Sequence, residues 1–233
     1  MRLVLIRHAH SEANAAGILS GRLPNVHLTE KGLEQSEHLA VRLGNFPVAT
    51  LRVSPMERCF ETISPWINSI VLPNNPKFTP IIDKELTEVD YGSWSGKSLA
   101  SLRRKSQWKV VQDFPSQMVF PEGESLLEMQ GRALSGFYRL NSVKGKGPRL
   151  LVSHGDVIKS IVASVLGTHL DHFQKIVIDP ASLTVLDFNG VDYRVLTLNN
   201  TTAPISAFLK EESSKKKSVS ALLGGGSGRK GKG

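Results

Sequence analysis

Short apolar runs alternate with stretches of helical spacing along this chain, and that alternation limits the folds open to it more than any other feature. Runs of five largely apolar residues, the length of short buried strands, occur at 2–6, 49–53, 78–82 and 149–153. The long connections between them repeat apolar residues at the intervals of an amphipathic helix. Strands that alternate with helices build a mainly parallel sheet covered on both faces. The sequence therefore predicts an α/β fold, a three-layer α/β/α sandwich with a mainly parallel central sheet.

Capping residues mark where the helices begin. Thr29 is suited to cap a helix that turns four apolar side chains toward the core, at Leu33, Leu39, Ala40 and Leu43. Ser54 and Pro55 predict a second start, with serine as N-cap and proline in the first turn, for a helix that runs to about residue 68. Ser125 and Glu128 have the spacing of a capping box before a long helix with apolar residues at 126, 129, 133, 137 and 140. Further helices are expected at 99–111 and 157–166.

Loops and turns complete the predicted order of elements. The polar segment 9–27 predicts a long loop with one helical turn, and 73–80 is a connection punctuated by prolines. Near the C-terminus, apolar runs at 183–188 and 193–198 flank Asn189 and Gly190, a pattern typical of a β-hairpin. We expect this hairpin to close the sandwich.

The positive charge of the chain is concentrated near its C-terminus. The net charge is +8, and residues 210–233 carry +5 of it, with seven Lys or Arg against two Glu. A segment so rich in Gly, Ser and Lys cannot bury enough apolar surface to order itself. We therefore expect one folded domain at 1–205 and a disordered basic Gly/Ser/Lys tail at 206–233. Such a tail suits RNA, an acidic partner or anionic lipid, but a solvated extension without a nucleic-acid partner is the favoured interpretation.

Composition also bears on the compartment. The sequence has no apolar run of the roughly 18 to 20 residues that a membrane-spanning helix needs. The apolar run that follows Met1 and Arg2 is too short for a signal peptide. A single cysteine, Cys59, cannot form an internal disulfide. We therefore expect a cytoplasmic protein that does not insert into membranes.

Polar side chains gather where three of the predicted strands end. Residues 2–6 lead into Arg7 and His8, residues 49–53 precede Arg58, and residues 149–153 lead into His154. Loops at the carboxyl ends of parallel strands meet at one edge of the sheet, where ligands bind. Two arginines and two histidines suit a tetrahedral dianion there, because guanidinium groups match phosphate oxygens in geometry and charge. Other polar residues follow the same strands, at Ser11, Asn14, Ser54 and Ser153.

Five motifs follow one another along the chain. They are RHAHSEAN at 7–14, SPMERCFET at 54–62, ELTE with YGSWSG at 85–96, PEGES at 121–125 and SHG at 153–155. In content and order they resemble the motifs of the histidine phosphatase superfamily, the group that contains cofactor-dependent phosphoglycerate mutases and many small-molecule phosphatases. The resemblance covers about residues 1–200 and favours the small-molecule phosphatase branch, with 1–205 as the catalytic domain.

The resemblance implies a reaction and a nucleophile. His8 would attack phosphorus and form a phosphohistidine, which splits one difficult displacement into two easier ones. Glu88 would protonate the leaving alkoxide and then activate the water that hydrolyses the intermediate. Glu85 and Asp90 are rival proton donors. The resemblance implies a small phosphorylated metabolite as substrate and no metal or cofactor.

The resemblance also assigns the residues that would hold the phosphoryl group. Arg7, Arg58 and His154 would stabilise the charge on its oxygens, and Ser11 and Asn14 are additional donors.

Two positions depart from the family's pattern. Ala9 stands where glycine is usual, and Ser95 replaces an acidic residue common before the glycine at 96. Because neither is a residue expected to do chemistry, we expect the departures to affect the substrate and not the reaction. Specificity is expected to come from the segment 97–121. Trp94, Trp108 and Phe114 are candidates for an apolar wall, or for the core.

Three alternatives stay open at this point. A metal hydrolase would use close pairs of ligands such as His8 with His10, His154 with Asp156, or His169 with His172. A phosphoglycerate mutase would return the phosphoryl group to a phosphoglycerate, although the 33 residues between Glu88 and Glu122 leave little room for an enclosing insertion. An inactive member would only bind phosphorylated ligands.

Overall fold

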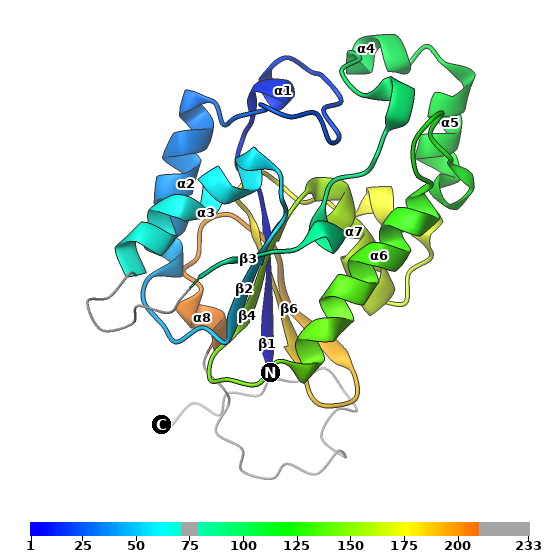
Figure 1. Ribbon diagram of the computed structural model, residues 1–233. Coiled ribbons are helices and arrows are strands. Elements are labelled where there is room, and N and C mark those ends of the chain that lie inside the picture. Colours follow the sequence, from blue (N-terminus) through cyan, green and yellow to red (C-terminus); the bar gives the residue numbers. More distant parts are fainter. Residues whose placement is uncertain (71–78, 210–233) are drawn as a thin grey trace, which may run out of the picture.

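The computed structural model describes residues 1–70 and 79–209, and within them one six-stranded sheet forms the centre of the molecule (Figure 1). The strands lie in the order β3-β2-β4-β1-β5-β6. The pairs among β3, β2, β4 and β1 are parallel, whereas β5 pairs antiparallel with both β1 and β6. This confirms the mainly parallel sheet. The strands are β1 (Arg2–Arg7), β2 (Thr50–Val53), β3 (Ile81–Ile82), β4 (Arg149–Ser153), β5 (Leu183–Phe188) and β6 (Tyr193–Asn200).

Helices cover both faces of this sheet. α2, α3 and α8 lie on one face and α6 and α7 on the other, while α1, α4 and α5 stand above the upper edge in Figure 1. The α-helices are α1 (Glu12–Ala15), α2 (Glu30–Leu43), α3 (Glu57–Ile70), α4 (Leu99–Leu102), α5 (Ser106–Asp113), α6 (Leu126–Arg139), α7 (Gly155–Val165) and α8 (Ser206–Leu209). Short 3₁₀ helices occupy Lys84–Leu86, Gly92–Trp94, Pro115–Gln117, Leu140–Ser142 and Leu170–Lys175.

The three layers follow from the alternation of side chains along the strands. In β1, Leu3 and Leu5 are buried with α6 and α7, whereas Val4 and Ile6 are buried with α2 and α3. A strand that is apolar on both faces requires cover on both. This confirms the predicted sandwich.

The helix after Thr29 forms as predicted, with one error. The Thr29 hydroxyl accepts a hydrogen bond from the Gly32 amide at 3.1 Å, and Leu39 and Leu43 are buried. Leu33, however, is 52% exposed. The first turn of α2 packs so closely against the backbone of His10 that a Cβ at Gly32 would lie 2.0 Å from the His10 carbonyl oxygen. The helix therefore buries the face that carries Gly32, and Leu33 faces solvent.

The predicted helix start at Ser54 and Pro55 is wrong. Helix α3 begins at Glu57, and the Ser54 hydroxyl lies 2.8 Å from Nε2 of His154, the residue that follows the neighbouring strand β4. The helix expected at 99–111 is also interrupted: α4 ends at Leu102 and α5 begins at Ser106.

Most of the remaining elements match the sequence. The Ser125 and Glu128 capping box begins α6, and its five predicted apolar positions are buried. The helix expected at 157–166 is α7, and the loop at 9–27 contains α1 as its helical turn. The hairpin of β5 and β6 forms around residues 189–192, where the Asn189 side chain accepts hydrogen bonds from the amides of Val191 and Asp192 at 2.9 and 2.8 Å.

Two predictions concern segments that the structure describes only in part. Residues 206–209 form α8, which packs against the core on the α2 and α3 face, and residues 210–233 lie outside the described part of the chain. The domain boundary at 205 and the disordered tail therefore stay predictions. The connection at 73–80 and the strand at 78–82 also fall partly outside it, and only 81–82 is strand. Among the described residues no helix is long and apolar enough to cross a membrane.

Candidate active site

The register of the central strands brings His8 and His154 side by side. Arg7 at the end of β1 pairs with Ser153 at the end of β4, and the His8 amide continues this ladder by donating to the Ser153 carbonyl at 2.9 Å. The residue directly after each strand is a histidine. The centroids of the two rings are 5.2 Å apart, where β1 and β4 end.

The surroundings of His8 determine its protonation. Its Nδ1 lies 2.7 Å from the Ala9 carbonyl oxygen, which can only accept, so Nδ1 carries the proton. Burial, together with the neighbouring Arg58 and Arg7 guanidinium groups, lowers the pKa of His8 well below its usual value. The ring is therefore neutral at neutral pH, and Nε2 keeps its lone pair.

His154 is held in the opposite tautomer. Nη2 of Arg58 lies 3.2 Å from Nδ1 of His154, and a guanidinium only donates, so Nδ1 accepts. The proton is then on Nε2, which donates to the Ser54 hydroxyl at 2.8 Å. Burial, and then Arg58 and His8, lower the pKa of His154 well below its usual value. Both histidines at this edge are neutral.

The two arginines present buried donors that no group of the described chain accepts. Nη1 of Arg7 donates to the Ile178 carbonyl at 2.5 Å, and Nη2 of Arg58 donates to the Gly21 carbonyl at 2.9 Å. Nε of Arg7, and both Nε and Nη1 of Arg58, are buried without a hydrogen-bond partner among the described residues. Unsatisfied buried donors are costly, and donors with positive charge suit an anion. The two guanidinium groups therefore favour an anion at this site.

The carboxyl group of Glu88 lies beside His154. Its Oε2 lies 3.7 Å from Nδ1 of His154, and its Oε1 accepts from the Val89 amide at 3.0 Å. Burial, and then the negative charge of Asp156, raise the pKa of Glu88 to about 7. At neutral pH this carboxyl group can therefore either give or take a proton.

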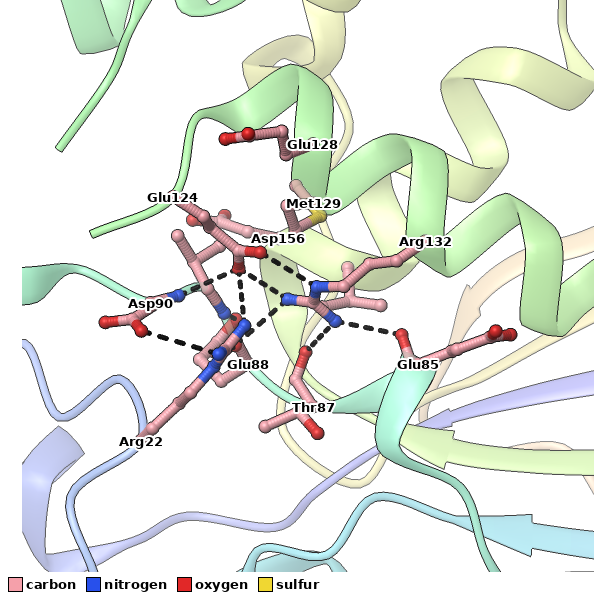
Figure 2. Close-up of polar contacts among 12 residues, drawn as sticks. Arg22, Glu85, Thr87, Glu88, Asp90, Glu124, Glu128, Met129, Arg132 and Asp156 are labelled. Atoms are coloured by element: carbon pink, nitrogen blue, oxygen red, sulfur yellow. Dashed lines mark hydrogen bonds and ion pairs between the residues drawn. The ribbon is translucent and has the colours of Figure 1, made fainter.

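A network of two arginines and a glutamate holds the backbone of Glu88 (Figure 2). Arg132, on α6, donates to the carbonyls of Glu85, Thr87 and Glu88 at 2.9, 2.6 and 3.0 Å. Its Nε and Nη2 also contact both carboxylate oxygens of Glu124, at 2.9 and 2.6 Å. We call Arg132 and Glu124 the carboxylate clamp. Because the clamp holds three carbonyls between residues 85 and 88, it fixes the segment from which the Glu88 side chain projects.

Arg22 joins this network from the loop near α1. Its Nε donates to the Glu88 carbonyl at 3.0 Å, and its Nη2 lies 2.9 Å from Glu124 (Figure 2). Glu124 also accepts from the Asp90 amide at 2.8 Å. Three segments far apart in sequence therefore meet at the Glu88 backbone.

The structure separates Glu88 from its two rivals. Glu85 forms an ion pair with Arg139 on the outer side of α6. Asp90 accepts from the Gly92 amide at 3.0 Å and pairs with Arg22 at 3.4 Å. Neither Glu85 nor Asp90 lines the cavity that contains His8, whereas Glu88 does.

Ser11 and Asn14, the two additional donors predicted for the phosphoryl group, lie in different surroundings. Ser11 is buried and caps α1: its hydroxyl donates to Oδ1 of Asn14 at 3.0 Å and accepts from the Asn14 amide at 3.3 Å. Asn14 lines the cavity, and because its Oδ1 is used by Ser11, its NH₂ group is the part left for a ligand. The roles predicted for these two residues remain predictions.

A cavity of about 440 Å³ opens above His8. Trp94 and Trp108 line it as expected, but Phe114 does not, and it is 50% exposed. Asp156, on the first turn of α7, also lines it and accepts from the Tyr91 hydroxyl at 3.1 Å. Sequence reasoning missed this role of Asp156, although its position two residues after His154 at a helix start was a usable signal.

The methyl group of Ala9, at the position where the family usually has glycine, lies outside the cavity. Ala9 is fully buried, and its methyl group packs in a small cluster with Leu28 and Ala181. Its amide donates to the Thr62 hydroxyl at 2.8 Å. The extra methyl group thus fills space on the α2 and α3 side of His8.

The histidine pairs weighed as metal ligands do not form a cluster. In residues 1–70 and 79–209, no three His, Cys, Asp or Glu side chains are placed to hold one ion. Nδ1 of His10 lies 2.9 Å from the Thr29 hydroxyl, beside α2, and His169 caps the 3₁₀ helix Leu170–Lys175.

The fold and the site together define an α/β protein with paired histidines and arginines at the carboxyl edge of its parallel strands. Residues 3–201 match the histidine phosphatase superfamily (branch 1), and the chain belongs to this family.

Several named proteins are similar to this chain over most of its length. Phosphoserine phosphatase 1 of Hydrogenobacter thermophilus is 26% identical over 203 residues, which cover 86% of this chain and 93% of that protein. The 2,3-bisphosphoglycerate-dependent phosphoglycerate mutase of Thermoplasma acidophilum is 26% identical, covering 84% and 90%. Among solved structures, YhfR of Bacillus stearothermophilus superposes with a TM-score of 0.77 at 25% identity, covering 86% and 98%.

Proposed function

We propose that this protein hydrolyses phosphomonoesters of small metabolites through a phosphohistidine on His8. The observation that carries the proposal is the state of His8: a buried, neutral imidazole whose Nδ1 proton is held by the Ala9 carbonyl, with Nε2 available as nucleophile. The unpartnered donors of Arg7 and Arg58 supply the positive site that a phosphoryl dianion needs.

The first chemical step forms the intermediate. Nε2 of His8 attacks phosphorus, the ester P–O bond breaks, and the protonated carboxyl group of Glu88 gives its proton to the departing alkoxide. Arg7, Arg58 and the Asn14 amide hold the phosphoryl oxygens as their charge redistributes.

The second step returns the protein to its starting state. The Glu88 carboxylate takes a proton from water as the water oxygen attacks phosphorus, the N–P bond breaks, and inorganic phosphate leaves. A pKa of about 7 suits Glu88 to both steps, because the two forms of the carboxyl group are present together at neutral pH.

Transfer to water is favoured over transfer to a second phosphoglycerate. The stretch between Glu88 and Glu122 has only 33 residues and forms the short helices α4 and α5. The similarity to a mutase keeps interconversion of 2- and 3-phosphoglycerate as the second candidate. Measuring phosphate release and interconversion on the same preparation distinguishes the two.

The proposal is tested with His8→Ala and a matched control, His10→Ala. Both remove a histidine from one loop, but only His8 lines the cavity. We expect His8→Ala to abolish phosphate release and the acid-labile phosphorylated form seen by mass spectrometry, and His10→Ala to keep both. Activity should persist in EDTA. Undiminished turnover in His8→Ala, or its loss in EDTA with recovery on adding one divalent ion, would refute the mechanism.

A further inference from the structure

Positive charge is concentrated on the segment 97–113, which forms one wall of the cavity above His8. The segment has five Lys or Arg and one acidic residue, Asp113, and its net charge is +4. Residues 1–209 carry only +3 in total, because 210–233 hold +5 of the net charge of +8, so the rest of 1–209 has a net charge of −1. We call the five cations of this segment the basic rim: Lys97, Arg103, Arg104, Lys105 and Lys109.

The basic rim lies beside the cavity of the candidate active site. Helix α4 lines this cavity through Leu99, and Arg103, the residue after α4, lines it too. Helix α5 lines it through Trp108 and Gln112, and both helices stand above the sheet in Figure 1. The five side chains of the basic rim are exposed. Their charge therefore acts on the solvent beside the cavity.

No carboxylate of residues 1–70 and 79–209 forms an ion pair with the basic rim. Two acidic residues line the cavity, but both have other neighbours. Asp156 accepts from the Tyr91 hydroxyl at 3.1 Å and pairs with Lys159 at 3.4 Å, and Glu88 lies beside His154. Like charges that stay unpaired attract dissolved anions and raise their local concentration, and salt screens this attraction.

The transferred phosphoryl group leaves the basic rim unused. In the proposed reaction its oxygens are held by Arg7, Arg58 and the Asn14 amide, none of which belongs to the rim. Of the five rim residues only Arg103 lines the cavity. The other four cations therefore act on a substrate from a distance, or on a part of it that lies outside the cavity.

We infer that the basic rim draws polyanionic phosphate esters to the cavity, so that the protein selects substrates by their total negative charge. This inference rests on the proposed function. A segment with a net charge of +4 attracts an ester with a second dianionic group more strongly than an ester whose only charge is the reacting phosphoryl group. The rim residues determine specificity in this way and take no part in the chemical steps.

Two esters with closely matched leaving groups measure this selection. Hexyl phosphate and hexane-1,6-diol bisphosphate both release an unbranched primary alkoxide, but the bisphosphate carries a second dianionic group at the far end of its chain. We expect kcat/KM per phosphoryl group, from inorganic phosphate release by the full chain, to be about tenfold higher for the bisphosphate at about 10 mM ionic strength, mainly through KM.

Salt should remove this preference. At about 0.5 M ionic strength the Debye length falls to about 4 Å, and the ratio of kcat/KM for the bisphosphate over hexyl phosphate should approach one. A ratio near one at low salt, or a ratio that salt does not change, would overturn the inference.

Variants assign the selection to the basic rim. Arg104→Gln combined with Lys105→Gln removes two charges that lie outside the cavity, and Lys105 makes no side-chain capping hydrogen bond at the start of α5. We expect this double variant to lower the low-salt ratio about threefold and to match the wild type at about 0.5 M ionic strength, where a structural defect would persist. Arg104→Lys combined with Lys105→Arg keeps both charges and should keep the ratio.

The matched control is Lys144→Gln combined with Lys146→Gln. Both lysines are exposed and precede β4, so they lie at the end of this strand opposite His154, and their replacement removes the same two charges. This control should leave the low-salt ratio unchanged. Equal effects of the two double variants, or a loss in Arg104→Gln with Lys105→Gln that persists at high salt, would contradict the inference.

Binding separates this inference from the proposed function. If the full chain releases no phosphate from either ester, the proposed hydrolysis fails. Calorimetric titration with the same two esters then still tests the basic rim. Tighter binding of the bisphosphate at low salt, weakened by Arg104→Gln with Lys105→Gln, supports selection by charge, and equal binding of the two esters refutes it.

Discussion

Replacing Arg132 with methionine tests whether the carboxylate clamp both stabilises the fold and positions Glu88. The guanidinium makes five hydrogen bonds, three to the carbonyls of Glu85, Thr87 and Glu88 and two to Glu124 (Figure 2). The Arg132 and Glu124 side chains are only 19% and 14% exposed. Methionine keeps the apolar stem but removes every one of these donors, so carbonyl and carboxylate groups are left without their partner.

The size of the effect follows from burial. Removing one partner of a buried ion pair costs about 3–5 kcal/mol, because the remaining charge stays buried. Glu124 keeps the Asp90 amide and Arg22, which favours the lower end, and we expect Arg132→Met to lower the free energy of unfolding by about 3 kcal/mol. Phosphate release should also fall, because the Glu88 backbone loses one of the two arginines that hold its carbonyl.

Urea unfolding followed by circular dichroism measures this loss as a lower midpoint at unchanged slope. Arg139→Met is the matched control on the same helix, because Arg139 forms ion pairs with Glu85 and, at 3.8 Å, with Asp83, but does not hold the Glu88 backbone. Arg139 pairs with Glu85 at a side chain that is 44% exposed, so its removal should cost less than about 1 kcal/mol. Equal losses in the two variants, or a loss below about 1 kcal/mol in Arg132→Met, would refute the reasoning.

The ion pair of Arg132 and Glu124 should also make the stability of the protein depend on pH. Burial alone would raise the pKa of Glu124, but hydrogen bonds from Arg132 and the Asp90 amide outweigh it and lower the pKa. A carboxyl group with a depressed folded pKa contributes stability above its unfolded pKa of about 4.3, and this contribution is lost as pH falls through the folded value. The stability difference between the wild type and Arg132→Met should therefore shrink below about pH 4.

Three further predictions address the site. Glu88→Gln should slow phosphorylation of His8 by an alkyl phosphate about 10²- to 10⁴-fold in rapid-quench experiments, and phosphorylation by p-nitrophenyl phosphate far less, because nitrophenolate leaves without a proton. In the wild type, the rate with the alkyl phosphate should fall above about pH 7, where Glu88 loses its proton, and a flat pH profile would contradict the role of Glu88 as proton donor. Gly155→Ala would place a Cβ 3.3 Å from the Arg7 guanidinium, and we expect a several-fold higher KM with little change in circular dichroism. Cys59 is buried and burial raises its pKa to about 12, so a thiol reagent should label it only after unfolding; rapid labelling of the folded protein would contradict its placement.

The sequence alone was sufficient for the fold class and for the histidine pair. The apolar runs of β1 and β4 and the capping residues Thr29 and Ser125 are local properties, and they predicted strands, helices and layers that the structure contains. Because parallel neighbours end at one edge, two histidines placed directly after strands were bound to meet once β1 and β4 paired.

The sequence could not decide among residues whose neighbours come from elsewhere in the chain. Nothing within the acidic segment separates Glu88 from Glu85 and Asp90; the difference lies in α6, which draws Glu85 outward through Arg139 and holds the Glu88 backbone through Arg132. Likewise, nothing in the sequence separates Trp108, which lines the cavity, from Phe114, which does not, or shows that the predicted single helix breaks into α4 and α5.

There is a physical reason why some features could be predicted from the sequence and others could not. Hydrogen bonding within a turn and the period of side chains along a strand depend on residues close in sequence, so they can be predicted from it. Burial and the pKa values of His8 and Glu88 depend on desolvation and on charges that Arg58 and Asp156 bring from distant segments. The sequence therefore determined which groups reach the edge of the sheet, and only the tertiary structure decided their protonation, their partners and the shape of the cavity above them.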